Sequence, residues 1–90
     1  MKTLEECRTE IDALDEELVQ LFEKRFHVIK DVVIYKQANN LPVFDVSREE
    51  EITQRNKDFL EDKELEKYFV QWYQELLKIS KQYQDDILQG

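Results

Sequence analysis

Glycine and proline are almost absent from this chain of 90 residues, each occurring once, as Gly90 and Pro42. Sheets with tight turns rely on these residues, because glycine adopts positive φ angles and proline fixes φ for a turn. A chain that lacks them favours long helices joined by few connections. The sequence therefore predicts an all-α fold, organised as one domain over residues 1–90.

Apolar residues recur along the chain with alternating spacings of three and four, the pattern of amphipathic helices. The first run covers about residues 4–37 and ends at "ANNLP", where asparagines tolerate left-handed geometry and proline prevents continuation. A short second helix is expected over about residues 47–60, with Ser47 as its N-cap in a capping box. A long third helix follows over about residues 65–88. The prediction is three helices per chain.

The predicted first helix is too long for a compact domain of this size. At 1.5 Å per residue, about 34 residues extend roughly 50 Å. A compact chain of 90 residues has a radius of gyration of only about 12 Å. The two shorter helices would leave part of its apolar stripe exposed, and such stripes usually pack against a partner helix. We therefore expect an intertwined homodimer.

Composition limits the partners and the compartment. The net charge is −8, whereas binding to phosphates requires a basic surface, so nucleic acid is not expected as a partner. No run of about 18 apolar residues predicts a membrane span, and the N-terminus does not resemble a signal peptide. The single cysteine, Cys7, fits a reducing compartment. The sequence predicts a cytoplasmic protein without a membrane partner.

Three cations interrupt the apolar face of the first helix, at Arg8, Arg25 and Lys36. A cation on a buried seam needs an anionic partner, although its charged end can also reach water or a nearby carboxylate. Arg25 and Lys36 are eleven residues apart and project within about 20° of each other. Arg8 lies about 25 Å from Arg25 along a straight helix, rotated by about 100°. One small ligand can meet all three only if Arg8 comes from a second subunit.

The third helix places polar groups in an apolar row. Ser80 and Gln84 lie one turn apart among apolar neighbours, so Gln84 either is buried and needs a hydrogen-bond partner or lies at the solvent edge. The sequence contains no glycine-rich phosphate loop, no cluster of metal ligands and no serine or cysteine at nucleophile spacing from a histidine. We expect no metal, no cofactor and no covalent catalysis.

Together these features resemble the all-helical class of chorismate mutases over nearly the whole chain. The family opens with Arg-x-x-Ile-x-x-Leu-Asp, continues with a spaced arginine and lysine and an Asp-x-x-Arg-Glu block, and ends with a serine and glutamine four residues apart. The residues that match this pattern are Arg8, Ile11, Leu14, Asp15, Arg25, Lys36, Asp45, Arg48, Glu49, Ser80 and Gln84. Each element is weak alone, and their common spacing makes the resemblance specific.

The resemblance implies a reaction and a set of roles. Chorismate, a small dianion, would rearrange to prephenate without a cofactor, in the biosynthesis of phenylalanine and tyrosine. Arg25 and Arg8 of the partner subunit would bind the two carboxylates. Lys36 would contact a carboxylate and the ether oxygen, to which Gln84 would donate from the other side.

By the same resemblance, Glu49 would accept from the ring hydroxyl, and Arg48 would be the cation on the substrate-facing side of the second helix. Asp45 and Ser80 would add polar contacts. Isochorismate pyruvate lyase of salicylate synthesis is an alternative on the same fold, although that family lacks the Asp-x-x-Arg-Glu block. A non-catalytic dimerisation module is another alternative, and docking on an upstream shikimate-pathway enzyme is a further hypothesis.

Overall fold

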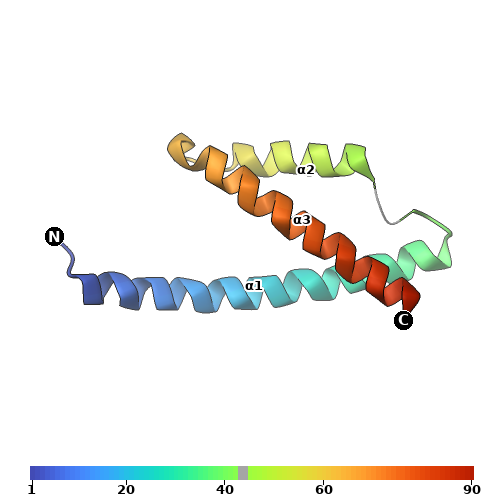
Figure 1. The fold of residues 1–90 in the computed structure, drawn as a ribbon, viewed down its shortest axis with the longest axis horizontal. Helices are drawn as coiled ribbons and strands as arrows, with labels where there is room; N and C mark the ends of the chain where they lie inside the picture. The colour runs from blue at the N-terminus through green and yellow to red at the C-terminus, as the bar shows by residue number, and fades with distance from the viewer. Residues whose placement is uncertain (43–44) are drawn as a thin grey trace.

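The computed structural model describes residues 1–42 and 45–90, and within them all regular structure is helical. The elements in chain order are α1 (Leu4–Ala38), α2 (Val46–Asp58), the 3₁₀ turn η1 (Lys63–Leu65) and α3 (Glu66–Gln89). Figure 1 shows α3 running diagonally back across the C-terminal part of α1. The predicted all-α fold with three α-helices is confirmed, and η1 is an addition that the sequence pattern did not indicate.

Both ends of α1 are defined by local hydrogen bonds. The Thr3 hydroxyl accepts from the Glu6 amide at 3.1 Å and caps the N-terminus. At the other end Asn40 adopts a left-handed φ of 54°, and the Leu41 amide bonds back to the Lys36 carbonyl at 2.9 Å. This is a Schellman-type ending, which satisfies carbonyls that the helix leaves open. The predicted termination at "ANNLP" is confirmed.

The N-cap of α2 is Asp45, and the expectation that Ser47 caps this helix is wrong. The Asp45 carboxylate accepts from the Arg48 amide at 3.1 Å, which is the usual bond from an N-cap to the third helical residue. Ser47 lies inside the helix and is exposed. The Asp45 side chain therefore stabilises the start of α2, the segment that also contains the predicted site residues Arg48 and Glu49.

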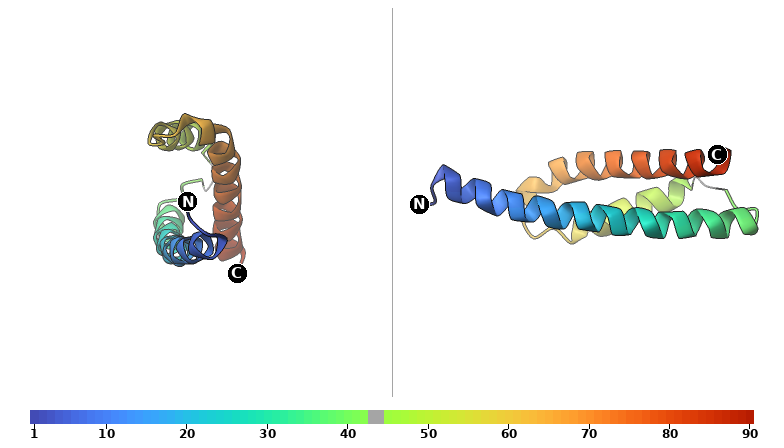
Figure 2. Two further views of the ribbon diagram at one scale, coloured as in Figure 1. Left: turned by 90° about the vertical axis from the view of Figure 1, so that its left-hand side faces the viewer. Right: turned by 90° about the horizontal axis from the view of Figure 1, so that it is seen from below.

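The three helices form an open frame, with α3 between α1 and α2. Seen end-on in Figure 2, α1 and α2 lie on opposite sides and α3 joins them. In the described part of the chain the backbone of α3 lies close to both helices, whereas the backbones of α1 and α2 do not approach each other. Phe26 of α1 meets Tyr83 of α3 with ring centroids 5.2 Å apart. On the other side the Asn56 amide donates to the Tyr73 hydroxyl at 3.0 Å.

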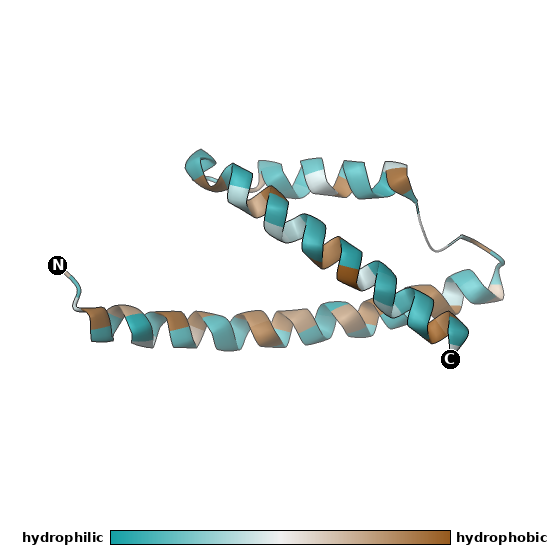
Figure 3. Ribbon diagram, in the orientation of Figure 1, coloured by the Kyte–Doolittle hydropathy of each residue, from teal (hydrophilic) through white to brown (hydrophobic). Residues whose placement is uncertain are grey.

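The buried core of the single chain is small. Among the described residues only Val33 is fully buried, and the buried face of α3 is the row Tyr73, Leu77, Ser80 and Gln84. The apolar residues along the first half of α1, which Figure 3 colours brown, are exposed to solvent. The accessible surface is 7584 Å², whereas a folded monomer of 11.0 kDa exposes about 5,600 Å². The radius of gyration, 16.4 Å, likewise exceeds the compact value of about 12 Å.

The helices are not of the kind that spans a membrane. Over the described residues, no helix combines the length and the apolar character that a crossing would require.

The cap of α2 can be tested by comparing Asp45→Ala with Ser47→Ala. Asp45→Ala removes an acceptor for a helix-start amide and should lower the free energy of unfolding by about 1 kcal/mol. Ser47→Ala changes an exposed residue inside the helix and should stay within about 0.5 kcal/mol of the parent. Urea denaturation followed by circular dichroism, at one fixed protein concentration, measures both. A larger effect for Ser47→Ala would restore Ser47 as the cap.

Candidate active site

A pocket of about 210 Å³ lies inside the frame, where all three helices face one another. It is the place where most of the predicted site residues meet. The predicted residues that line it are Arg25 and Lys36 from α1, Asp45, Arg48 and Glu49 at the start of α2, and Ser80 and Gln84 from α3. Segments that are far apart in the sequence thus supply one cavity of metabolite size, in which charged and polar side chains lie among apolar ones.

The guanidinium of Arg25 is held by Ser80. Its Nη1 donates to the Ser80 hydroxyl at 2.7 Å, and that hydroxyl donates to the Leu76 carbonyl at 2.8 Å. Ser80 is only 3% exposed, so this chain of hydrogen bonds is shielded from water. Because the serine hydrogen is directed to its own helix, its lone pairs face Arg25. Ser80 therefore fixes the orientation of the cation that the sequence analysis placed at the site.

Gln84 is the most unusual polar group in the pocket. It is 8% exposed, so the solvent-edge alternative does not hold in this structure. Its Nε2 donates to the Ser80 carbonyl at 3.3 Å, while its Oε1 is buried and has no partner in the described part of the chain. An unpaired buried acceptor destabilises a protein by about 1–3 kcal/mol. The amide thus has an open acceptor and one unused hydrogen, both available to a ligand.

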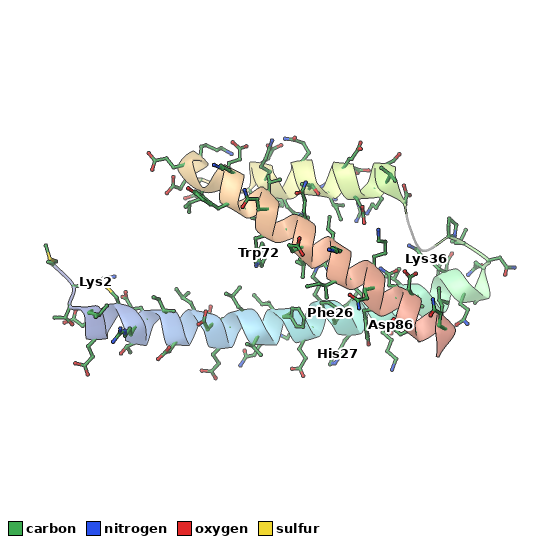
Figure 4. The ribbon with its side chains drawn as sticks, viewed as in Figure 1. Lys2, Phe26, His27, Lys36, Trp72 and Asp86 are labelled. Atoms are coloured by element: carbon green, nitrogen blue, oxygen red, sulfur yellow. The ribbon has the colours of Figure 1, made fainter. Side chains whose placement is uncertain are left out.

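The charge of the pocket is opposite to that of the chain. Its lining holds the four cations Arg25, Lys36, Arg48 and Lys81 and the two carboxylates Asp45 and Glu49. The chain as a whole carries −8. In Figure 4 Lys36 extends from α1 on the side of α2, whereas His27 points away from the other helices. A lining with excess positive charge in an acidic protein suits a small anion.

The structure adds one residue to the sequence-based site and leaves another outside the pocket of its own chain. Lys81 lines the pocket, although the sequence analysis did not include it. The available signal was its position four residues after Leu77, on the buried face of α3. Arg8, by contrast, is exposed near the start of α1 and does not line the pocket of its own chain. The expected supply of Arg8 by a second subunit stays a prediction.

An apolar groove of about 370 Å³ adjoins the pocket on the α1–α3 side. It is lined by Leu18, Val19, Leu21, Phe22, Arg25, Trp72 and Leu76. Figure 4 shows the side chain of Trp72 on α3 directed toward α1. Trp72 is 54% exposed in the single chain. Arg25 therefore lies between a polar pocket and an open apolar groove.

Comparison with known proteins assigns the chain to a family. Residues 7–85 match the family described as chorismate mutase type II. The chain belongs to this family. A stretch of 49 residues is 43% identical to T-protein of Haemophilus influenzae, and it covers 54% of this chain but 13% of that relative. None of the solved structures that were compared matches the chain significantly.

Family membership confirms the resemblance found in the sequence, over a range that contains all eight predicted site residues. The individual roles of these residues are taken up below as proposals. Among the residues that the structure describes, no three His, Cys, Asp or Glu side chains are grouped as metal ligands.

The unpaired oxygen of Gln84 leads to a prediction about the stability of the free protein. Gln84→Met replaces the amide with an apolar group of similar shape and removes the buried orphan acceptor. The free protein should then be as stable as the parent or more stable by up to about 1 kcal/mol, measured by urea denaturation. Destabilisation by more than about 1 kcal/mol would show that the amide is fully hydrogen-bonded without a ligand.

Proposed function

We propose that this protein is a chorismate mutase, which converts chorismate to prephenate without a cofactor. The observation that carries the proposal is the pocket itself. In a member of the chorismate mutase type II family, it combines excess positive charge with a buried amide that has unused hydrogen-bonding capacity. A dianion matches the positive charge, and an ether oxygen between its two charged parts can accept the second Nε2 hydrogen of Gln84.

The proposed reaction is a unimolecular rearrangement. One carbon–oxygen bond of the ether breaks while a carbon–carbon bond forms in the same cyclic transition state, so no nucleophile, proton or electron has to be supplied. The protein contributes in two ways. It holds the side chain of the substrate over the ring, which is an effect of orientation. It also stabilises the negative charge that develops on the ether oxygen.

The cations hold the two ends of the substrate in this mechanism. Arg25, oriented by Ser80 at 2.7 Å, binds one carboxylate, and Arg8 of the partner subunit binds the other. Lys36 lies at the end of α1 and reaches both a carboxylate and the ether oxygen. Gln84 donates its second amide hydrogen to that oxygen from α3. Loss of one such preorganised donor typically lowers the rate by about 10² to 10³.

The start of α2 completes the proposed site. Glu49 accepts a hydrogen bond from the ring hydroxyl, and Arg48 adds positive charge on the same side of the pocket. The Asp45 carboxylate accepts from the Arg48 amide through Oδ1, and in the proposed site the backbone of Asp45 adds a further polar contact to the ligand. The helix cap and the pocket wall are thus one structure, and a shift of α2 would move three site residues together.

A homodimer is part of the proposal. The single chain exposes about 2,000 Å² more surface than a folded monomer of its mass, out of 7584 Å². An excess of this size agrees with the large, apolar interfaces of obligate dimers. The first half of α1 of the partner would cover the apolar groove beside Arg25 and bring in its Arg8. Each dimer would hold two such sites. We place the reaction in phenylalanine and tyrosine biosynthesis in the cytoplasm.

The activity is tested by product identification. The purified protein should form prephenate from chorismate, without added metal or cofactor, and NMR of the reaction mixture distinguishes the products. Salicylate and pyruvate formed from isochorismate alone would replace the proposal with the lyase. Turnover of neither compound would leave a helical dimerisation module, in which the cations of α1 serve assembly.

Sharing of the site between subunits is tested by complementation. Arg8→Ala and Arg25→Ala should each be nearly inactive as homodimers, because each removes a carboxylate-binding cation from both sites. After subunit exchange, a heterodimer contains one site with both arginines and one site with neither. Activity should therefore return to at most one site per heterodimer. Failure to recover activity, when exchange is demonstrated with differently tagged chains, would contradict a shared site.

A further inference from the structure

Lys81 is a pocket cation that the proposed mechanism does not use. It follows Ser80 directly on α3 and is half-buried. It lines the pocket together with Glu49 and Leu77, and the same three residues also line an outer groove of about 460 Å³ between α2 and α3. Lys81 therefore lies between the candidate site and this outer groove.

The charge balance of the pocket depends on this residue. With Lys81 the lining that one chain supplies carries four cations and two carboxylates, a net charge of +2, to which Arg8 of the partner subunit would add one in the proposed dimer. Without Lys81 the charge of this single-chain lining falls to +1, in a chain of −8 that repels the same ligand. The remaining cations include Arg25, whose guanidinium is tied to Ser80. Lys81 lines both the pocket and the groove, so its positive charge lies beside the path between them.

We propose that Lys81 is a further substrate-binding residue, whose ammonium attracts the dianion and contacts one of its carboxylates from the α3 side. The inference rests on the proposed function and deepens it. Its contribution is made equally to substrate and transition state, since a carboxylate keeps its charge throughout the rearrangement. It acts on KM and on the rate of association rather than on kcat. A purely structural ion pair with the carboxylates of α2 would not have this signature.

The chain offers a matched control for the test. Lys78 lies three residues earlier on α3, is exposed, and lines the outer groove but not the pocket. Lys81→Gln and Lys78→Gln change the net charge of the chain equally. The first variant should lower kcat/KM about fivefold at low salt, the effect of one unit charge about 4 Å from another in water-like surroundings. The second should match the parent.

The expected pattern has three further parts. The loss in Lys81→Gln should appear in KM, with kcat within about twofold of the parent. It should shrink as ionic strength rises toward about 1 M, where the Debye length is about 3 Å. Lys81→Arg should restore most of kcat/KM at low salt, because it restores the charge.

Three results would overturn the proposal. Equal losses in Lys81→Gln and Lys78→Gln would assign the effect to the charge of the chain as a whole. A lower midpoint of thermal unfolding for Lys81→Gln with unchanged KM would make Lys81 an interhelical ion-pair partner. A loss confined to kcat and independent of salt would place it in the chemical step.

The proposed function can fail separately from this inference. If the parent protein does not turn over chorismate, that function fails, and the variants are then compared by calorimetric titration with prephenate. Weaker binding by Lys81→Gln alone would support Lys81 as an anion-binding residue of a site with other chemistry. Equal binding by Lys81→Gln and Lys78→Gln, or no binding by any variant, would overturn the inference.

Discussion

The difference in length between α1 and α3 determines which surfaces of the single chain stay exposed. α1 has 35 residues and extends about 52 Å, whereas the 24 residues of α3 extend about 36 Å and cross only the C-terminal part of α1. The backbone of α2 does not approach that of α1 in the described residues, so the first half of α1 receives no cover from its own chain. Its apolar residues and Arg8 are therefore directed outward. The proposed dimer and the proposed contribution of Arg8 in trans both follow from this one geometric fact.

The buried seam and the candidate site are the same row of α3. Tyr73 and Leu77 are apolar core residues, whereas Ser80 and Gln84 continue the row with polar groups. Polar groups in so small a core cost stability unless they are hydrogen-bonded. Ser80 is satisfied by Arg25 and by its own helix, but Gln84 is satisfied only in part. Such a compromise between stability and function is typical of residues kept for binding or catalysis.

The sequence predicted those features that depend on spacing within one helix. It predicted the end of α1 from the asparagines and proline, and the shared face of Arg25 and Lys36 from their separation of eleven residues. It missed η1, since three residues leave no periodic signal. It placed the N-cap of α2 at Ser47 from the capping-box spacing, whereas the cap is Asp45. Lys81 was missed because a lysine beside polar residues on one helix resembles a solvated one. Only the arrangement of three helices shows that it lines a pocket.

The distribution of charge in the pocket bears on where rate enhancement would arise. In the proposed rearrangement both carboxylates keep their charge, so cations that bind them stabilise substrate, transition state and product to a similar degree. Interactions of that kind lower KM and position the substrate, but they lower the barrier only through orientation. The new charge develops on the ether oxygen, and the groups proposed to face it are Lys36 and Gln84. The Nε2 of Gln84 uses one hydrogen on the Ser80 carbonyl, so its second hydrogen is a donor already placed in the free protein, and little reorganisation is needed when the charge appears.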